Sequence, residues 1–421
     1  MEGFGHINGC HGLAERLRDR GHRVVFAIDK KFAGRLAPHG FEEEHMYSEN
    51  SELPPGAVDP IFIMLNENGL LFAQEPIKVV EFCANAFVAM MGEVRQKDTQ
   101  YKAVLDKVKP DVIVIDSYMS SPVLMKSGIP WVWLYSAGPL GTFNNDNLPP
   151  GWLGLPTNDG REKWTQLKIQ IESIWKDLHK DVNEWMVSEG VDPLPSESNR
   201  FLHHFSKHLN IYMTPKELDY KELQPLAHNW HRVDGFVRTT HDTFEIPECL
   251  RNRQGKLVLL SMGSLGCAIV ELMVRLTTIL GKSKHRFIVN TGPLHDKYSL
   301  PDNMWGQPFL PQTAILPLVD LVLTHGGNNT VTETFYFGKP MLVLPLWADQ
   351  YDNAQRLQES GLGLRLDPFR CTEEELLTSI DKLVNDSNLA QRMESIGDRI
   401  RDNNDKQIIA KRFEDLFIRN N

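Results

Sequence analysis

Short apolar runs alternate with longer amphipathic segments along the first half of the chain. The apolar runs are rich in β-branched and aromatic residues, and they cover residues 22–28, 111–116 and 131–135. Helical spacing of apolar residues covers 8–20, 76–107, 119–127 and 161–189. Such alternation predicts parallel sheets whose strands are joined by helices.

The second half repeats the alternation more cleanly. Its strand-like runs are 256–262, 286–290, 321–325, 341–345 and 363–367. Residues 236–255 lack periodicity and are interpreted as a connecting segment. We therefore predict an α/β protein with two doubly wound sheets in tandem, 1–235 and 236–403. Ligands bind beyond the carboxyl ends of the strands in such sheets, here in the cleft between the halves.

Composition narrows the class of protein. The chain of 421 residues has a formal net charge of -10, which argues against a nucleic-acid partner. Its five cysteines are scattered without a CxxC pair, as is typical of free thiols in a reducing compartment. The chain shows no secretory signal and no apolar run long enough to span a membrane. We expect a cytoplasmic protein.

The segment 309–353 carries the clearest chemistry. A buried strand, DLVLTH, ends in the turn HGGNN, and a helix opens near Asn329. Glycine lets the backbone approach a ligand closely, and a helix N-terminus suits a diphosphate. Glu333, one turn along, is an acceptor suited to a ribose diol. Taken alone, the Gly-Gly turn would equally fit an ordinary strand-to-helix connection.

The whole segment resembles the donor-binding signature of the family 1 UDP-glycosyltransferases. The matching positions are Phe309, Pro311, Gln312, His325, Gly327, Asn329, Thr330, Glu333, Gly338, Pro340, Asp349, Gln350 and Asn353. The resemblance implies two Rossmann-like domains facing a cleft, the GT-B arrangement, with a last helix at about 404–421 packing back on the first domain. The spacing from Phe309 to His325, and Asn328 in place of a plant tryptophan, look closer to bacterial macrolide-type and soluble arthropod members.

The resemblance also implies a role for each donor-site residue. Phe309 stacks on uracil and Gln312 bonds the base edge, while Glu333 holds the ribose. His325, Gly327, Asn329 and Thr330 surround the diphosphate, and Asp349 and Gln350 bind the sugar hydroxyls. Ser264, in the turn SMGS, is a further donor ligand by resemblance, although a helix N-cap would use the same residue.

Transfer of a sugar to an alcohol needs a base, and histidine is the usual one. The turn GFGHIN at 3–8 resembles the family's Gly-His-x-Asn turn, which assigns the base to His6. Asp116 ends the strand DVIVID and matches the orienting carboxylate, although a helix cap is an alternative for it. The rival base His11 lies within the following helix and is interpreted as a packing or surface residue.

The start of the chain does not match this fold. A central β-strand should precede GFGHIN, but only Met1 and Glu2 do so. Either the printed start is mis-set or trimmed, or the first sheet lacks a central strand. In the second case the base would be poorly placed, which affects activity rather than family.

The acceptor is expected on the first half. The candidate contacts are Tyr118, Met119, Phe87 and Phe143, each of which would also make an ordinary core residue. Aromatic and methionine side chains suit an apolar pocket. The expected acceptor is a lipophilic hydroxyl compound such as a flavonoid, a phenolic or another xenobiotic, which suggests detoxification.

We therefore predict an inverting UDP-dependent hexosyltransferase that uses UDP-glucose and acts as a monomer. No Asp-x-Asp motif or metal-ligand spacing occurs, so neither a metal nor another cofactor is expected. The alternatives are a UDP-sugar-binding protein without activity, a UDP-GlcNAc epimerase and an NAD-dependent oxidoreductase. The last lacks a full GxGxxG after a strand.

Overall fold

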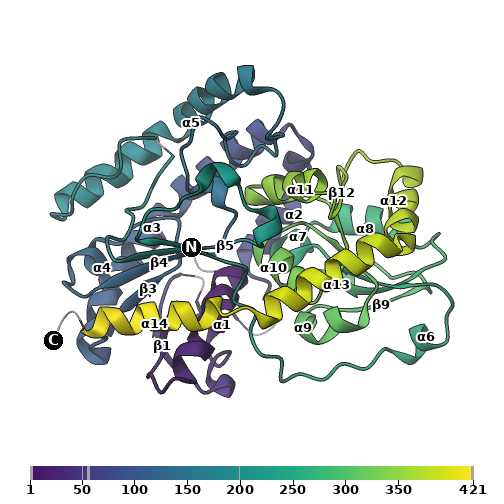
Figure 1. Ribbon diagram of the computed structural model, residues 1–421, viewed down its shortest axis with the longest axis horizontal. Coiled ribbons are helices and arrows are strands. Elements are labelled where there is room, and N and C mark those ends of the chain that lie inside the picture. Colours follow the sequence, from purple (N-terminus) through teal and green to yellow (C-terminus); the bar gives the residue numbers. More distant parts are fainter. Residues whose placement is uncertain (1–2, 50, 55–56, 199, 419–421) are drawn as a thin grey trace.

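The computed structural model describes residues 3–49, 51–54, 57–198 and 200–418. Figure 1 shows two α/β halves side by side. Within the described residues the strands form three parallel sheets, with orders β1-β2, β3-β4-β5-β6 and β12-β11-β10-β7-β8-β9. Both halves thus have the parallel sheets covered by helices that the alternating pattern predicts.

The first half contains two of these sheets. Its strands are β1 Val25–Asp29, β2 Glu42–Met46, β3 Ile113–Ile115, β4 Trp131–Tyr135, β5 Leu209–Met213 and β6 Trp230–Val233. Its helices are α1 Phe4–Arg18, α2 Pro60–Glu67, α3 Pro76–Val108, α4 Pro122–Lys126 and α5 Arg161–Ser188. The apolar pattern does not predict β2, β5 or β6, because their sequences EEEHM, LNIYM and WHRV include polar residues.

The second half holds the larger sheet. Its strands are β7 Leu257–Ser261, β8 Arg286–Asn290, β9 Met304–Gln307, β10 Leu321–Thr324, β11 Met341–Val343 and β12 Gly363–Arg365. Its helices are α6 Glu248–Arg251, α7 Gly263–Gly266, α8 Val270–Leu280, α9 Gln312–Ile315, α10 Asn328–Tyr336, α11 Asp349–Glu359, α12 Glu373–Asn385 and α13 Ser387–Asp402, followed by α14 Asp405–Ile418. The pattern predicts all of these strands except β9.

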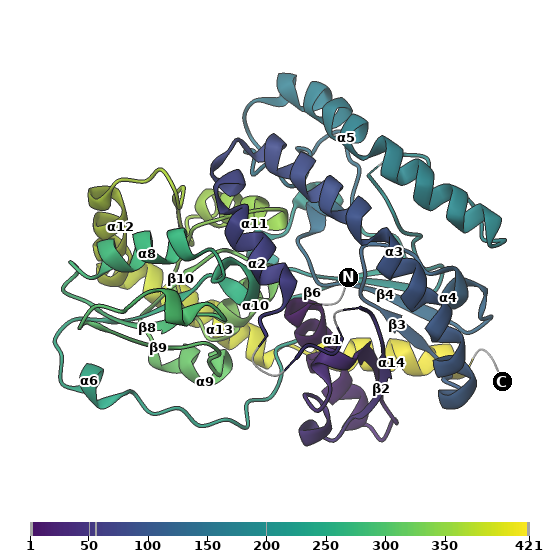
Figure 2. The same ribbon diagram turned by 180° about the vertical axis from the view of Figure 1, so that it is seen from behind.

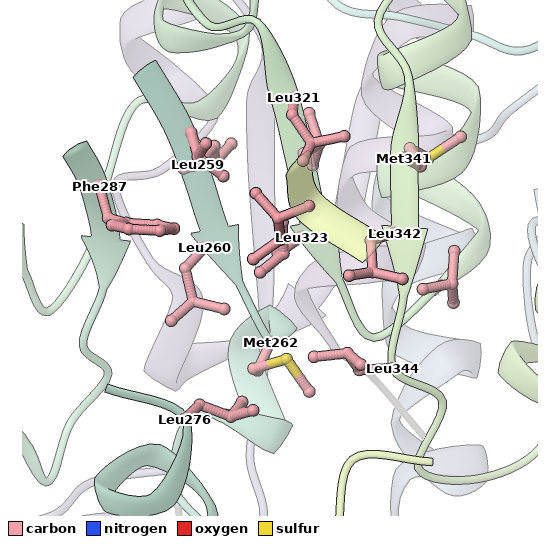
Figure 3. Packing of buried hydrophobic residues seen from close by; sticks show 14 of the residues in the cluster. Leu259, Leu260, Met262, Leu276, Phe287, Leu321, Leu323, Met341, Leu342 and Leu344 are labelled. Carbon is pink, nitrogen blue, oxygen red and sulfur yellow. The ribbon is translucent and has the colours of Figure 1, made fainter. Parts of the chain in front are cut away.

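The central strands of the second half are buried along their whole length. Every residue of β7, β10 and β11 is buried. Figure 3 shows Leu260, Leu323 and Leu342 from these three neighbouring strands packed together. Parallel strands with helices on both faces need continuous apolar runs, which explains why these strands are predicted so readily.

Shortening one of these buried side chains should lower the stability of the fold. Leu323 has no exposed surface, so Leu323→Ala should lower the free energy of unfolding by about 2–5 kcal/mol. Val274→Ala is the control, because Val274 is 41% exposed on α8. Urea denaturation measures both variants. Equal midpoints for the two would show that the sheet does not pack as described.

The last helix leaves the second half and packs on the first. Figures 1 and 2 show α14 beside α1. Its Ile409 and Phe413 are buried in one cluster with Leu13 of α1 and Leu134 of β4. The predicted boundary near residue 235 falls between β6 and β7, and it stays a prediction.

The first half differs from an unbroken doubly wound sheet. Strands β1 and β2 form one sheet, and β3 to β6 form another. The helix predicted over 8–20 begins at Phe4 and ends at Arg18, so GFGHIN lies within its first turns rather than in a turn before it. Met1 and Glu2 lie outside the described residues. In the described part of the chain, no helix has the length and apolar character needed to cross a bilayer.

Candidate active site

The structure brings His6 and Asp116 together. His6 lies in the first turn of α1, and Asp116 follows β3 directly. The Nδ1 atom of His6 lies 2.9 Å from Oδ1 of Asp116, whose side chain is 3% exposed. A carboxylate at Nδ1 holds the proton there, so Nε2 is the nitrogen that can accept a proton from a substrate.

His11, the rival base, has a different environment. It is buried, with Nε2 3.4 Å from Oε1 of Glu15, and its ring lies 4.6 Å from that of His39. Glu15 also accepts a hydrogen bond of 2.8 Å from the backbone N–H of Thr239 in the connecting segment. His11 therefore packs α1 in place, as expected for a packing residue.

The two glycine turns of the second half meet around His325. A Cβ atom on Gly263 would lie 2.5 Å from the imidazole, and one on Gly327 would lie 2.4 Å from it. Gly263 also has φ +74, a conformation that favours glycine. Ser264 lies in α7, directly after this contact, so both predicted phosphate turns lie at the same place. Burial lowers the pKa of His325 to about 4, so the ring is neutral near pH 7 and has a single N–H group.

Glu333 is held by two side chains. Its Oε2 accepts a hydrogen bond of 2.7 Å from Nε2 of Gln312, and its Oε1 pairs with the guanidinium of Arg238. Gln312 in turn accepts a bond of 3.0 Å from the hydroxyl of Ser261 and donates to Thr330 at 3.3 Å. The predicted base, ribose and diphosphate ligands thus form one network. Phe309 is 53% exposed.

The N-terminus of α10 contacts the first half. Asn329 donates a hydrogen bond of 2.7 Å to the carbonyl of Gly5, one residue before His6. Asn328 donates to the carbonyls of Ser136 and Met213, at 3.0 and 2.8 Å. These bonds place the end of α10 predicted to bind the diphosphate beside the turn of α1 that carries His6.

The predicted sugar ligands have their acceptor atoms engaged within the protein. Asp349 accepts a bond of 2.7 Å from the N–H of Gly138, which crosses between the halves. Gln350 accepts bonds of 2.9 and 3.2 Å from the N–H groups of Leu346 and Trp347. Burial raises the pKa of Asp349 to about 6. Asp349 therefore stabilises the contact between the halves, and Gln350 stabilises its own loop.

The sequence reasoning missed two residues: Arg238, which pairs with Glu333, and Asp352, which connects the halves. Arg238 comes from the connecting segment, which has no motif. Asp352 lies in α11 and accepts bonds of 2.7 and 3.0 Å from the N–H groups of Trp152 and Gly154. The only feature of the sequence that could have indicated Asp352 is its position just after the Asp349–Gln350 pair.

Asp352 should make stability depend on pH. Burial raises its pKa from 3.8 to about 7, so its contribution to folding stability is full below pH 4 and is lost as pH rises to about 7. Between pH 5 and pH 8, the wild-type free energy of unfolding should fall by about 2–3 kcal/mol more than that of Asp352→Asn. Denaturant titrations at both pH values measure this difference. Asp302→Asn, on the exposed surface, should behave like the wild type, and a parallel response of Asp352→Asn would contradict the assignment.

The acceptor candidates separate into two groups. Tyr118 lies edge-on to His6 at 5.3 Å and to Phe87 at 5.8 Å, so these two aromatic residues extend from the base. Met119 is buried beside them in the same cluster. Phe143 differs, because its ring contacts are with Tyr212 and Trp230, at 5.5 and 4.7 Å.

Metal ligation has no support from side-chain clusters. Across the residues that the structure describes, no three His, Cys, Asp or Glu side chains are grouped so that they could hold an ion. The residues predicted to hold the diphosphate lie at the end of β10 and in the first turn of α10.

Comparisons with known proteins agree with this architecture. The family profile of the UDP-glucoronosyl and UDP-glucosyl transferases matches residues 199–398. The NDP-glycosyltransferase YjiC of Bacillus licheniformis is 24% identical over 406 residues, covering 94% of this chain and 91% of its own. The oleandomycin glycosyltransferase of Streptomyces antibioticus is 26% identical over 412 residues, covering 93% of this chain and 84% of its own.

Solved structures show the same fold. The glycotransferase of kitacinnamycin superposes with a TM-score of 0.71 at 19% identity, covering 98% of this chain and 96% of its own. The calicheamicin glycosyltransferase CalG4 superposes with a TM-score of 0.65 at 19% identity, covering 99% of this chain and 96% of its own. The fold and the site thus define a glycosyltransferase with two facing Rossmann-like halves. Together with the family profile and the relatives above, these structures support a family 1 glycosyltransferase.

Proposed function

We propose that this enzyme transfers glucose from UDP-glucose to a hydroxyl of a small lipophilic acceptor, with inversion at the anomeric carbon. The observation that carries the proposal is the contact between the α1 turn holding His6 and the N-terminus of α10. The base and the diphosphate helix are adjacent there, joined by the bond from Asn329 to Gly5. A single displacement needs both groups on the same reacting centre.

The proposed reaction is a direct displacement. Nε2 of His6 takes the acceptor proton, and the acceptor oxygen forms a bond to the anomeric carbon as the bond to the phosphate oxygen breaks. UDP leaves with the electron pair of that bond. Asp116 stabilises the imidazolium that forms. The first N–H groups of α10 would stabilise the charge on UDP, and the proposal includes no metal ion.

The donor contacts follow the network around Glu333. Phe309 would stack on uracil, and Glu333 would accept the ribose hydroxyls, next to Gln312. Asp349 and Gln350 would bind the sugar after a rearrangement of their present hydrogen bonds. Ser264 would add a phosphate contact. Support for glucose comes from the residue types Asp349 and Gln350 together with the description of the matching family.

The acceptor surface around His6 is aromatic. Tyr118 and Phe87 extend from His6, and Trp152 lies 6.3 Å from the ring of Tyr118. A flat phenolic compound, such as a flavonoid or another xenobiotic, would stack on these rings. Support for lipophilic acceptors also comes from a relative that is named for the macrolide oleandomycin. All five cysteines are free thiols, which supports a reducing, cytoplasmic location, and the proposed acceptors support a role in detoxification.

The test is UDP release from UDP-glucose with a panel of phenolic acceptors. Release that requires both substrates is the expected result. UDP-GlcNAc, UDP-glucuronic acid and dTDP-glucose are compared as donors. Binding of UDP by calorimetry without release for any acceptor would favour the second candidate, a UDP-sugar-binding protein. The division of the first-half sheet into two parts is the observation behind that candidate.

A further inference from the structure

The start of the connecting segment lies against both helices of the candidate site. Helices α1 and α10 are neighbours in Figures 1 and 2. A Cβ atom on Gly12 of α1 would lie 2.1 Å from the carbonyl oxygen of Phe236, so α1 packs directly on the segment. A Cβ atom on Gly235 would lie 2.8 Å from Cβ of Thr332 in α10. Residues 235–239 are therefore packed between the helix of the predicted base and the helix of the predicted diphosphate ligands.

Arg238 extends a positive charge from this segment to the donor residues. Its guanidinium pairs with Oε1 of Glu333, and the two side chains are 19% and 6% exposed. A guanidinium carries five N–H donors. Within the part of the chain that the structure describes, Arg238 donates to no acceptor other than Glu333. Most of its donors are thus available to a ligand that enters the donor site.

The ion pair with Arg238 does not use up the acceptor capacity of Glu333. An ionised carboxylate has about four lone-pair sites. Glu333 accepts from Arg238 at Oε1 and from Nε2 of Gln312 at Oε2, the latter at 2.7 Å. The carboxylate can therefore keep both partners and still accept the ribose hydroxyls, so that Arg238 lies beside the ribose and does not compete with it.

The predicted diphosphate ligands lie within reach of this guanidinium. Asn329 and Thr330 are four and three positions before Glu333 in α10, and side chains at these spacings are neighbours on one face of a helix. Gln312 also joins Thr330 to Glu333, because its Nε2 donates to both, at 3.3 and 2.7 Å. Arg238 is thus about one helical turn from these ligands, a distance that a long and flexible arginine side chain can span.

The predicted diphosphate ligands themselves lack a positive charge near pH 7. Ser264, Asn329 and Thr330 are neutral side chains, and His325 is neutral because burial lowers its pKa to about 4. The leaving UDP gains negative charge as its bond to the sugar breaks. A guanidinium suits this charge, because it can give a phosphate two parallel charge-assisted hydrogen bonds, each about twice as strong as a neutral one.

We propose that Arg238 is a further donor-binding residue, whose guanidinium contacts the diphosphate of the bound nucleotide while Glu333 holds the ribose. The inference rests on the proposed function, because it takes the ligand to be a nucleoside diphosphate sugar. The ion pair with Glu333 orients the guanidinium before the donor binds. No bond forms or breaks at Arg238. Its charge stabilises the diphosphate in the complex and the added negative charge on UDP as the sugar leaves.

The experiment compares UDP with uridine, which has the same base and ribose but no phosphate. Ligand-observed NMR titration of the full chain measures both affinities. Arg238→Gln keeps an N–H donor for Glu333 but removes the charge, so it should weaken UDP binding about 10–100-fold and leave uridine binding unchanged within about twofold. Arg238→Lys retains the charge and should recover most of the preference for UDP. Arg253→Gln is the matched control, because Arg253 is exposed in the same segment, and it should bind both ligands like the wild type.

Equal losses of UDP and uridine binding in Arg238→Gln would show that Arg238 acts only through Glu333, and unchanged UDP binding would show that it does not contact the phosphates. Either result overturns the proposal. Should thermal unfolding show that Arg238→Gln does not fold, Glu333→Gln takes its place. That variant removes the charge that offsets Arg238, so its preference for UDP over uridine should rise although both bind more weakly, and an unchanged or lower preference overturns the proposal. A wild type that binds neither ligand would instead contradict the proposed function, and the inference with it.

Discussion

Replacement of His6 by alanine should lower acceptor-dependent UDP release by about 10²–10⁴-fold, the usual contribution of a general base. Nδ1 of His6 is 2.9 Å from Asp116, so the variant loses an oriented Nε2. The release of UDP from UDP-glucose with a phenolic acceptor, measured at saturating donor, reports this loss. Donor binding should be unchanged, because it depends on the second half.

Two variants make the test of the base specific. Asp116→Asn keeps the shape of the side chain but removes the charge that stabilises the imidazolium, so the rate should fall at least about tenfold. His228→Ala removes an exposed histidine of the same half and should have no effect. An active His6→Ala, or equal losses in His6→Ala and His228→Ala, would reject the assignment of His6 as the base.

Replacement of Glu333 by glutamine should weaken UDP binding by about 10–100-fold, since hydrogen bonds to a charged group contribute about 1.5–3 kcal/mol. The carboxylate is buried and held by Arg238 and Gln312, so it is oriented before the ribose arrives. If it accepts the ribose hydroxyls, the wild type should prefer UDP to 2′-deoxy-UDP, and the variant should lose most of that preference. Titration calorimetry with both nucleotides measures this.

The matched control for Glu333 is Glu394→Gln, an exposed glutamate on α13. It should bind both nucleotides like the wild type. A Glu333→Gln protein that binds less UDP but keeps the full preference for the 2′-hydroxyl would place the ribose elsewhere. Because Glu333 pairs with Arg238, thermal unfolding should be recorded for the variant so that a loss of fold is not mistaken for a loss of contact.

The elements that the sequence predicts best are those whose own residues decide the structure. Strands β8 and β4 match their predicted runs RFIVN and WVWLY residue for residue, because buried parallel strands need apolar residues throughout. Strand β2, with sequence EEEHM, could not be predicted in this way. It is the outer strand of a two-stranded sheet, where polar side chains reach solvent.

The residues of the candidate site also divide into those that local sequence predicts and those that it does not. Asp116 directly follows β3 and Glu333 lies in the helix after β10, so the alternating pattern places each residue at the carboxyl end of its own sheet. Arg238 and Asp352 depend on contacts between residues about 95 and 200 positions apart, and local spacing carries no information about such contacts. The start of α1 was predicted four residues late, because the helix pattern was expected to follow a strand and a turn.

The crossing of α14 has a consequence for how the protein is made. Ile409, Ala410 and Phe413 are buried in the core of the first half, among residues that are synthesised about 180 to 400 positions earlier. A chain emerging from the ribosome normally folds its amino-terminal domain first. Here that domain lacks part of its interior until the last helix has emerged. The second half can therefore complete its core first, and the first half stays open to chaperones and proteases until α14 has emerged.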